Sequence, residues 1–95
     1  MPYTLKYHQA VRTDDIPLLN ADIKSRIRTA IEMRLSVVPY EYGEPLRKTL
    51  KGYWKLRVSD YRVVFLIEDQ DVLIIGIWHR KEVYRLMKKR IEGNR

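Results

Sequence analysis

Cations in two neighbouring β-like segments are the side chains of this chain best suited to chemistry. Lys55 and Arg57 lie in the first segment and Arg62 in the second, with Ser59-Asp60 between the segments. Arginine cannot serve as a base because its pKa exceeds about 12, but its planar fork matches the oxygens of a phosphate. Lysine can lose its proton where burial or other cations lower its pKa. The combination predicts a site for a phosphate ester.

RNA cleavage is a reaction that such a site could perform without a metal, if the 2′-OH attacks the adjacent phosphate. The enzyme must then remove that proton, stabilise a pentavalent phosphorane and protonate the leaving oxygen. A site made mainly of cations gains most from a substrate that another body holds in strained geometry. The candidate catalytic residues, with Tyr84 expected to stack on a base or orient the phosphate, are Lys55, Arg57, Arg62, His79, Arg80 and Tyr84.

A hairpin must position the first three of these residues. Residues 53–58 alternate between apolar and polar, and a two-residue turn at Ser59-Asp60 sets Arg57 opposite Arg62 with Lys55 on the same face. Like charges directly opposite each other are destabilising by a few tenths of a kcal/mol, up to about 1. A protein stabilised only by its core has no reason to build that pair.

A third strand is predicted over residues 72–79, where the chain is apolar on both faces and therefore suited to the sheet centre. If residues 68–71 form a four-residue loop, Arg62 lies opposite Ile77. His79 then projects from the same face as the cations, one pair beyond Ile77.

The rest of the chain completes an α+β fold with an antiparallel sheet. The expected elements are a strand over 3–11, N-cap candidates at Thr13-Asp14-Asp15, a helical stripe over 16–35 that breaks near Asn20, a stop at Val37-Val38-Pro39, a loop over 40–51 with at most a short strand around Leu46, and a helix from Arg80 onward.

Charge and composition limit the classes of function. The chain has 95 residues and a net charge of +7, all of which arises from residues 47–95. A localised positive field predicts a polyanion or an acidic protein as partner. With no cysteine and two histidines, a disulfide framework or a Cys-ligated zinc is excluded, and no metal site or cofactor is expected. We expect one cytoplasmic domain over 1–95 without a membrane segment.

Three segments together resemble the RelE/ParE superfamily of toxins from toxin–antitoxin pairs. They are Gly52-Tyr-Trp-Lys-Leu-Arg57, Asp60-Tyr-Arg-Val-Val-Phe65 and Ile77-Trp-His-Arg-Lys-Glu-Val-Tyr84, and Tyr42-Gly-Glu-Pro-Leu46 is similar to the loop before the second strand of that family. The resemblance implies a microbial ribonuclease-like α+β fold, in which two N-terminal helices pack across a twisted antiparallel sheet and a helix follows it. In the RelE branch it implies a toxin of a type II system that cleaves mRNA in the ribosomal A site without metal. A cognate antitoxin and the mRNA-bearing ribosome would be its partners, with no membrane and no small-molecule cofactor.

The resemblance also implies roles for single residues. Lys55 matches a lysine proposed as base or phosphate binder, and Arg57 and Arg62 match strand arginines that hold phosphate and stabilise the transition state. Arg80 matches an arginine proposed as an acid or charge stabiliser, and Tyr84 matches a tyrosine that stacks on or orients the substrate.

The identity of the base stays open. Well-known RelE enzymes carry two lysines one residue apart, whereas here Trp54 precedes Lys55 and the other lysine is Lys51. Some related toxins use a carboxylate and a histidine instead, which keeps Glu44 and His79 as candidates.

Basic residues outside the predicted cluster are expected to contact RNA or the ribosome. They are Lys51, Lys81, Arg85, Lys88, Lys89 and Arg90. A solvated helix face is the alternative for the run at 88–90. Two other functions remain open, namely a ParE-like inhibitor of DNA gyrase without nuclease activity and an inactive homologue that only binds an antitoxin.

Overall fold

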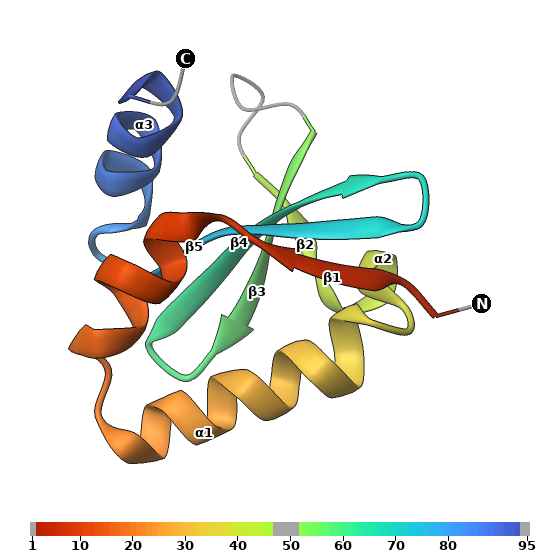
Figure 1. Cartoon of the computed structure of the whole chain (residues 1–95), viewed down its shortest axis with the longest axis horizontal. Coiled ribbons are helices and arrows are strands. Elements are labelled where there is room, and N and C mark those ends of the chain that lie inside the picture. Colours follow the sequence, from red (N-terminus) through yellow and green to blue (C-terminus); the bar gives the residue numbers. More distant parts are fainter. Residues whose placement is uncertain (1, 47–51, 94–95) are drawn as a thin grey trace.

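A five-stranded sheet organises the protein, in the order β1-β5-β4-β3-β2. The structure is a computed structural model that describes residues 2–46 and 52–93 (Figure 1). The elements are β1 (Thr4–Tyr7), the π-helical turn η1 (Val11–Asp15), the 3₁₀ turn η2 (Ile16–Leu18), α1 (Ala21–Ala30), the π-helical turn η3 (Ile31–Leu35), α2 (Pro39–Tyr42), β2 (Glu44–Pro45), β3 (Tyr53–Val58), β4 (Tyr61–Glu68), β5 (Asp71–His79) and α3 (Val83–Gly93). This order confirms the predicted α+β class, with two N-terminal helical segments, a meander and a C-terminal helix.

The first strand is shorter than predicted. It ends at Tyr7, and the chain turns helical from Gln9. The Nδ1 atom of His8 accepts a hydrogen bond from the N–H of Ala10 at 3.0 Å, which starts the turn. The N-cap expected at 13–15 is also wrong, because these residues lie inside η1.

The break near Asn20 is confirmed. The Asn20 side chain accepts a hydrogen bond from the N–H of Ile23 at 2.9 Å and caps α1, because a side-chain oxygen there satisfies one of the free N–H groups of the first turn. α1 continues into η3, and Ile27, Ile31 and Leu35 are buried at the predicted helical spacing.

The segment expected to be mostly loop contains the short helix α2 and the two-residue strand β2. Glu44 and Pro45 of β2 lie opposite Lys55 and Trp54 of β3. One further hydrogen bond, from the N–H of Leu46 to the Tyr53 carbonyl at 3.0 Å, continues this pairing.

The sheet is mixed, which corrects the expectation of a purely antiparallel one. β1 pairs with β5 in parallel, from Thr4 opposite Asp71 to Tyr7 opposite Ile74. A parallel pair needs a long crossover connection, and the helical segments and the meander between β1 and β5 provide it. β5 is an interior strand as predicted, although β4 is the central one.

A β-bulge alters the register between β4 and β5. Ile67 lies opposite Val72 as predicted, but Val64 lies opposite Gly76 and Phe65 opposite Ile74, so that Ile75 is an extra residue on β5. Such a bulge displaces the side chains that follow it by one position.

The two faces of the sheet are covered unequally. On one face Leu56, Val63 and Phe65 pack against α1 and η3 in the larger apolar cluster. On the other face α3 covers one end, where Trp78 and Met87 are buried. Figure 1 shows α1 along one side of the sheet and α3 beyond one end of it. No helix in the described ranges has the length and apolar composition needed to cross a membrane.

Candidate active site

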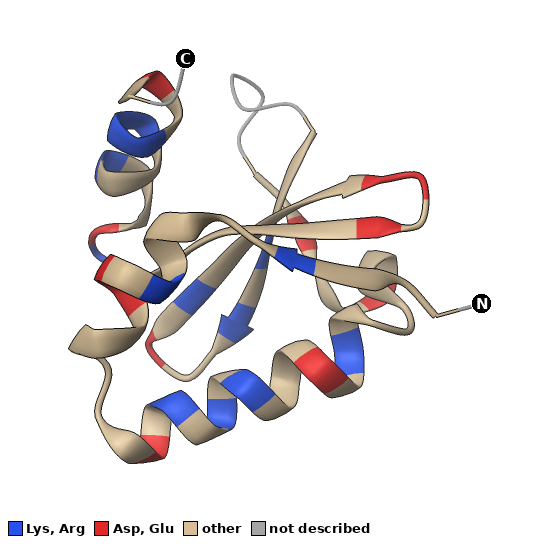
Figure 2. Cartoon of the chain, viewed as in Figure 1, with Lys and Arg blue, Asp and Glu red and all other residues tan. Residues whose placement is uncertain are grey.

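Lys55, Arg57 and Arg62 project from the face that α1 does not cover. Arg57 lies opposite Arg62 across a two-residue turn at Ser59-Asp60, as predicted. Ser59 adopts a φ of 54°, the left-handed conformation that such a turn requires. Figure 2 shows the basic positions of β3 and β4 side by side. The hairpin therefore brings three cations together.

Arg62 is the centre of this cluster. Burial of the guanidinium, together with the charges of Arg57 and Arg80, lowers the pKa of Arg62 from its ordinary value. Its Nη1 atom donates to the carbonyl oxygens of Ser59 at 3.0 Å and Tyr61 at 2.8 Å, which fixes the side chain along the turn. Neighbouring cations that disfavour each other's charge are stabilised by an anion placed between them.

Arg80 reaches the cluster from the end of β5. Its backbone N–H donates to the Asp60 carbonyl at 2.8 Å, and its Nε lies 3.9 Å from the Asp60 carboxylate. This exposed pair is too long and solvated to hold Arg80 firmly. Arg80 is therefore held by its backbone, while its side chain is exposed.

Lys55 and Tyr84 meet at the other side of the cluster. The Lys55 ammonium lies 5.8 Å from the centre of the Tyr84 ring, which α3 presents while the ring packs on the smaller apolar cluster. Glu44 is opposite Lys55 on β2 and thus belongs to the same face. Five predicted catalytic residues and the candidate carboxylate of Glu44 thus lie around one basic surface, which we call the basic face: Glu44, Lys55, Arg57, Arg62, Arg80 and Tyr84.

His79 does not join the basic face. Because of the bulge, Arg62 lies opposite Trp78 rather than Ile77, and His79 lies opposite Tyr61 on the other side of the sheet. The two rings are in edge contact at 5.5 Å, and the His79 Nδ1 accepts a hydrogen bond from the N–H of Lys81 at 3.2 Å. The expectation that His79 shares a face with Arg62 is wrong.

Arg90 is largely buried and makes structural contacts. Its guanidinium holds both carboxylate oxygens of Asp15 at 2.7 and 3.0 Å and lies over the Trp78 ring at 4.8 Å. It also donates to the Ile75 carbonyl at 3.1 Å, while Asp15 accepts from the N–H of Ile77 at 3.0 Å. With side-chain exposures of 12% for Arg90 and 4% for Asp15, the pair is largely buried, which favours a structural role for Arg90 over the predicted contact with RNA.

The other predicted docking residues are exposed, except that Lys51 lies outside the described residues. Arg85 forms an ion pair with Glu82 on α3. The exposed set is Lys81, Arg85, Lys88 and Lys89.

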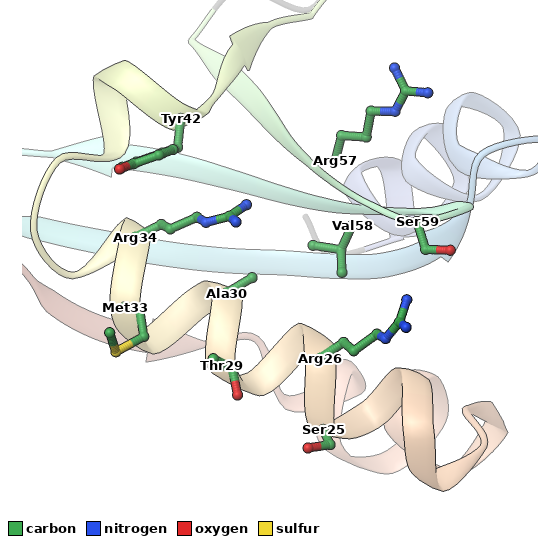
Figure 3. A pocket seen from close by; sticks show the side chains of 10 residues that line it. All are labelled: Ser25, Arg26, Thr29, Ala30, Met33, Arg34, Tyr42, Arg57, Val58 and Ser59. Atoms are coloured by element: carbon green, nitrogen blue, oxygen red, sulfur yellow. The ribbon is translucent and has the colours of Figure 1, made fainter.

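A cleft that sequence reasoning did not identify lies between α1 and the end of β3 (Figure 3). Its volume is about 710 Å³, and its lining includes Arg26, Arg34, Tyr42 and Arg57. The Arg34 guanidinium lies over the Tyr42 ring at 5.4 Å. Arginines on an outer helix face are ordinary in a sequence, so only the proximity of α1 to β3 in the fold could reveal this site.

Comparisons with known proteins assign this chain to a family. Residues 6–84 match the family described as ParE toxin of type II toxin–antitoxin system. Toxin RelG of Mycobacterium tuberculosis is 32% identical over 87 residues, which cover 90% of this chain and 99% of that protein. This chain belongs to the RelE/ParE superfamily of type II toxins.

Solved structures agree with the family of this toxin. A chain of the RelBE2 toxin–antitoxin complex of Mycobacterium tuberculosis superposes with a TM-score of 0.77 at 30% identity, covering 84% of this chain and all of that chain. The isolated RelE toxin of E. coli, at 23% identity and a TM-score of 0.67 over 94% of this chain and 98% of that one, shares the fold. Within residues 2–46 and 52–93 of the toxin, no three His, Asp or Glu side chains gather as metal ligands.

Proposed function

We propose that this toxin is a ribosome-dependent endoribonuclease that cleaves mRNA in the ribosomal A site and so stops translation in the cytoplasm. The observation that carries the proposal is that Arg57 lies opposite Arg62 across the hairpin, with Arg80 near enough to help lower the pKa of Arg62 and with Lys55 over the Tyr84 ring. Three cations without a buried carboxylate between them fit the charge of a scissile phosphate, which gains negative charge in the transition state.

Each residue of the basic face has a task in this reaction. Arg57 and Arg62 bind the non-bridging oxygens and stabilise the phosphorane, for which paired guanidinium forks are suited. Arg80 stabilises the charge that develops on the leaving oxygen, which takes its proton from solvent water because a guanidinium keeps its own. Tyr84 orients the nucleotide by stacking.

The base that takes the 2′-OH proton is Lys55 or Glu44, which lie opposite each other on β3 and β2. The reaction needs no metal-bound water as nucleophile because the RNA supplies its own 2′-hydroxyl. Single-turnover cleavage by Lys55→Met and Glu44→Gln separates the two, since loss of the base lowers the rate about 10²- to 10⁴-fold.

Two partners follow from the proposal. The ribosome holds the message in the geometry that a weak set of catalytic groups requires, and Lys81, Lys88 and Lys89 contact its RNA. A cognate antitoxin keeps the toxin inactive, as expected from the toxin–antitoxin complexes among its structural relatives.

The test is cleavage of a defined message on purified ribosomes, mapped by primer extension. We expect A-site cuts by the wild type, loss of cuts and of growth arrest in Arg62→Ala and Arg80→Ala, and wild-type cleavage by Arg28→Ala, an exposed arginine of α1 away from the basic face. Fully toxic Arg62→Ala and Arg80→Ala variants would contradict the site. Inhibition of gyrase supercoiling without message cleavage would contradict the activity.

A further inference from the structure

A buried ion pair joins the N-terminal and C-terminal helical segments of the protein. Arg90 of α3 holds Asp15 of η1 through two hydrogen bonds, at 2.7 and 3.0 Å, although the two residues are 75 positions apart. The Arg90 guanidinium also donates to the carbonyl of Ile75, the extra residue of the bulge in β5. Figure 1 shows α3 beside the helical segment that includes η1. One side chain of α3 is therefore fixed to η1 and to β5 at the same time.

The ion pair lies on the side of the sheet that carries the basic face. Trp78 lies opposite Arg62 on the neighbouring strand, and the Arg90 guanidinium stacks on the Trp78 ring at 4.8 Å. The ring packs against Gly76, where an added Cβ would overlap it. Gly76 and Lys55 belong to one cross-strand row and are two strands apart, which is about 10 Å at the usual spacing of strands. The contacts of Arg90 are thus close to the candidate active site.

α3 also carries Tyr84, and the Lys55 ammonium lies 5.8 Å from the centre of its ring. Apolar packing holds this helix as well, since Val83 and Met87 are buried in the smaller apolar cluster. Apolar contacts are non-directional, so they hold the helix on the sheet without fixing its rotation about its own axis. The planar fork of Arg90, by contrast, binds a carboxylate in one geometry. The direction of the Tyr84 ring therefore depends on the ion pair.

Stability alone is a poor reason for a buried ion pair. Two buried charges lose their hydration, and apolar residues of similar volume often stabilise a fold as well or better. What the ion pair adds is one defined arrangement of the groups that it joins. We propose that Asp15 and Arg90 are positioning residues that set the rotation of α3 and thereby the direction of the Tyr84 ring. The ring then stays over Lys55 and orients the nucleotide for cleavage, so this inference rests on the nuclease activity of the proposed function.

Two simpler roles of the ion pair lead to different expectations. If the pair only stabilises the fold, its loss lowers the cleavage rate through the unfolded fraction, whether or not Tyr84 is present. If it only presents Lys88 and Lys89 to ribosomal RNA, its loss weakens ribosome binding and again acts without Tyr84. A positioning role makes the effect of the pair depend on the tyrosine ring.

The variant that tests this dependence is Asp15→Asn/Arg90→Met. It removes both charges together, so no buried charge is left without a partner. The new amide oxygen can still accept from the N–H of Ile77, and the methionine occupies part of the arginine volume. Arg90→Lys, which keeps the charge of Asp15 paired but lacks the fork, replaces this variant if circular dichroism shows it to be unfolded. Ile31→Val is the matched control, because it trims the larger apolar cluster on the opposite face of the sheet.

The first test reads the position of the Tyr84 ring in the free toxin by NMR. The CεH2 protons of Lys55 experience the ring current of Tyr84, and Tyr84→Ala gives their chemical shift without the ring. We expect wild type and Ile31→Val to have the same shift, and Asp15→Asn/Arg90→Met to move most of the way to the shift of Tyr84→Ala. A wild-type shift in the double variant would overturn the proposal.

The second test is a double-mutant cycle in single-turnover cleavage on ribosomes, with rates corrected for the folded fraction. With Tyr84 present, loss of the ion pair should lower the rate about tenfold or more, because a small misplacement of an orienting group has a large effect. In the Tyr84→Ala background the same loss should change the rate by less than about twofold, as should Ile31→Val in the wild type. Equal losses in both backgrounds would overturn the proposal.

The two tests separate this inference from the proposed function. A wild type that never cuts message would contradict the nuclease activity. The Lys55 shift would still report whether the ion pair sets the direction of the Tyr84 ring.

Discussion

Two strands of this sheet extend beyond the strand paired with them, and the two extended ends have different surroundings. β5 extends beyond β1, and there the Arg90 side chain takes the Ile75 carbonyl while Asp15 takes the N–H of Ile77. β3 extends beyond β2, and there Arg57 is one of the residues that line the cleft beside α1. Exposed edges invite pairing with other chains, so proteins usually close them. The end that stays open is the one suited to a partner.

The same comparison distinguishes two kinds of arginine. Arg90 is neutralised by Asp15 and stacked on Trp78, so its charge serves the fold. Burial and the charges of Arg57 and Arg80 lower the pKa of Arg62, so its charge destabilises the folded state. The net charge of +7 counts both alike, although only the second kind is available to an anion.

Hydrogen exchange in the free toxin should show the largest contrast between the two ends. The Ile77 amide is bonded to buried Asp15 and should open only with large unfolding, whereas the Arg57 amide at the open edge should exchange without it. We expect roughly 10³-fold or greater protection of Ile77 over Arg57, measured by NMR. Similar rates for both amides would remove the distinction.

Asp15→Ala should destabilise the end of β5 that Asp15 and Arg90 cover. It leaves the Arg90 guanidinium and the Ile77 N–H without their carboxylate, and we expect a loss of about 3–5 kcal/mol in the free energy of unfolding. Urea denaturation measures it. Arg85→Ala, which removes an exposed ion pair with Glu82, is the control and should change stability by less than about 1 kcal/mol.

Gly76→Ala should disturb the layer beneath Arg90. A Cβ at this position would overlap the Trp78 ring, on which the guanidinium stacks. Overpacking of this kind costs about 1–3 kcal/mol, which the urea midpoint should report. A variant as stable as wild type would mean that the Trp78 ring can move aside at no cost.

Arg62→Gln, on the open side of the sheet, should change the free energy of unfolding in the opposite direction. Removing one of two like charges that face each other relieves a repulsion, so the folded state should gain a few tenths of a kcal/mol, up to about 1, while message cleavage is lost. A loss of stability above this size would place Arg62 with Arg90 among the structural arginines.

The smallest expected effect is the pH dependence of that gain. The pKa of Arg62 is lower in the folded than in the unfolded chain, so the cost of its charge is fully present below the folded pKa and disappears only as pH rises through it. Because a guanidinium titrates above about 12, the stability difference between Arg62→Gln and wild type should be the same at pH 6 and pH 9. A difference that changes between them would implicate another titrating group.

Local patterns were sufficient to predict the hairpin and the helical break. Alternation over 53–58 and a two-residue turn determine that Arg57 faces Arg62, because both depend on neighbours in sequence. The Asn20 cap and the stripe through Ile27, Ile31 and Leu35 are local in the same way.

Long-range geometry was not predictable in the same way. Asp15 and Arg90 are 75 positions apart, and each has an ordinary local interpretation, as a cap residue and as part of a basic run. The bulge at Ile75 depends on how β5 packs between two neighbours, and Ile75 is one apolar residue among many. The parallel pairing of β1 likewise depends on the path of the whole chain.

The bulge at Ile75 also affects how this strand is compared with its relatives. Side chains along a strand alternate with a period of two, and one extra residue reverses the phase of everything after it. Counting from the β4–β5 turn without the bulge would place Trp78 and His79 each on the wrong face of the sheet. In a relative without the extra residue, the histidine aligned with His79 would lie on the side of the sheet that carries the basic face rather than beside the residue equivalent to Tyr61. Equivalent positions in this strand are therefore found by counting back from its C-terminal end.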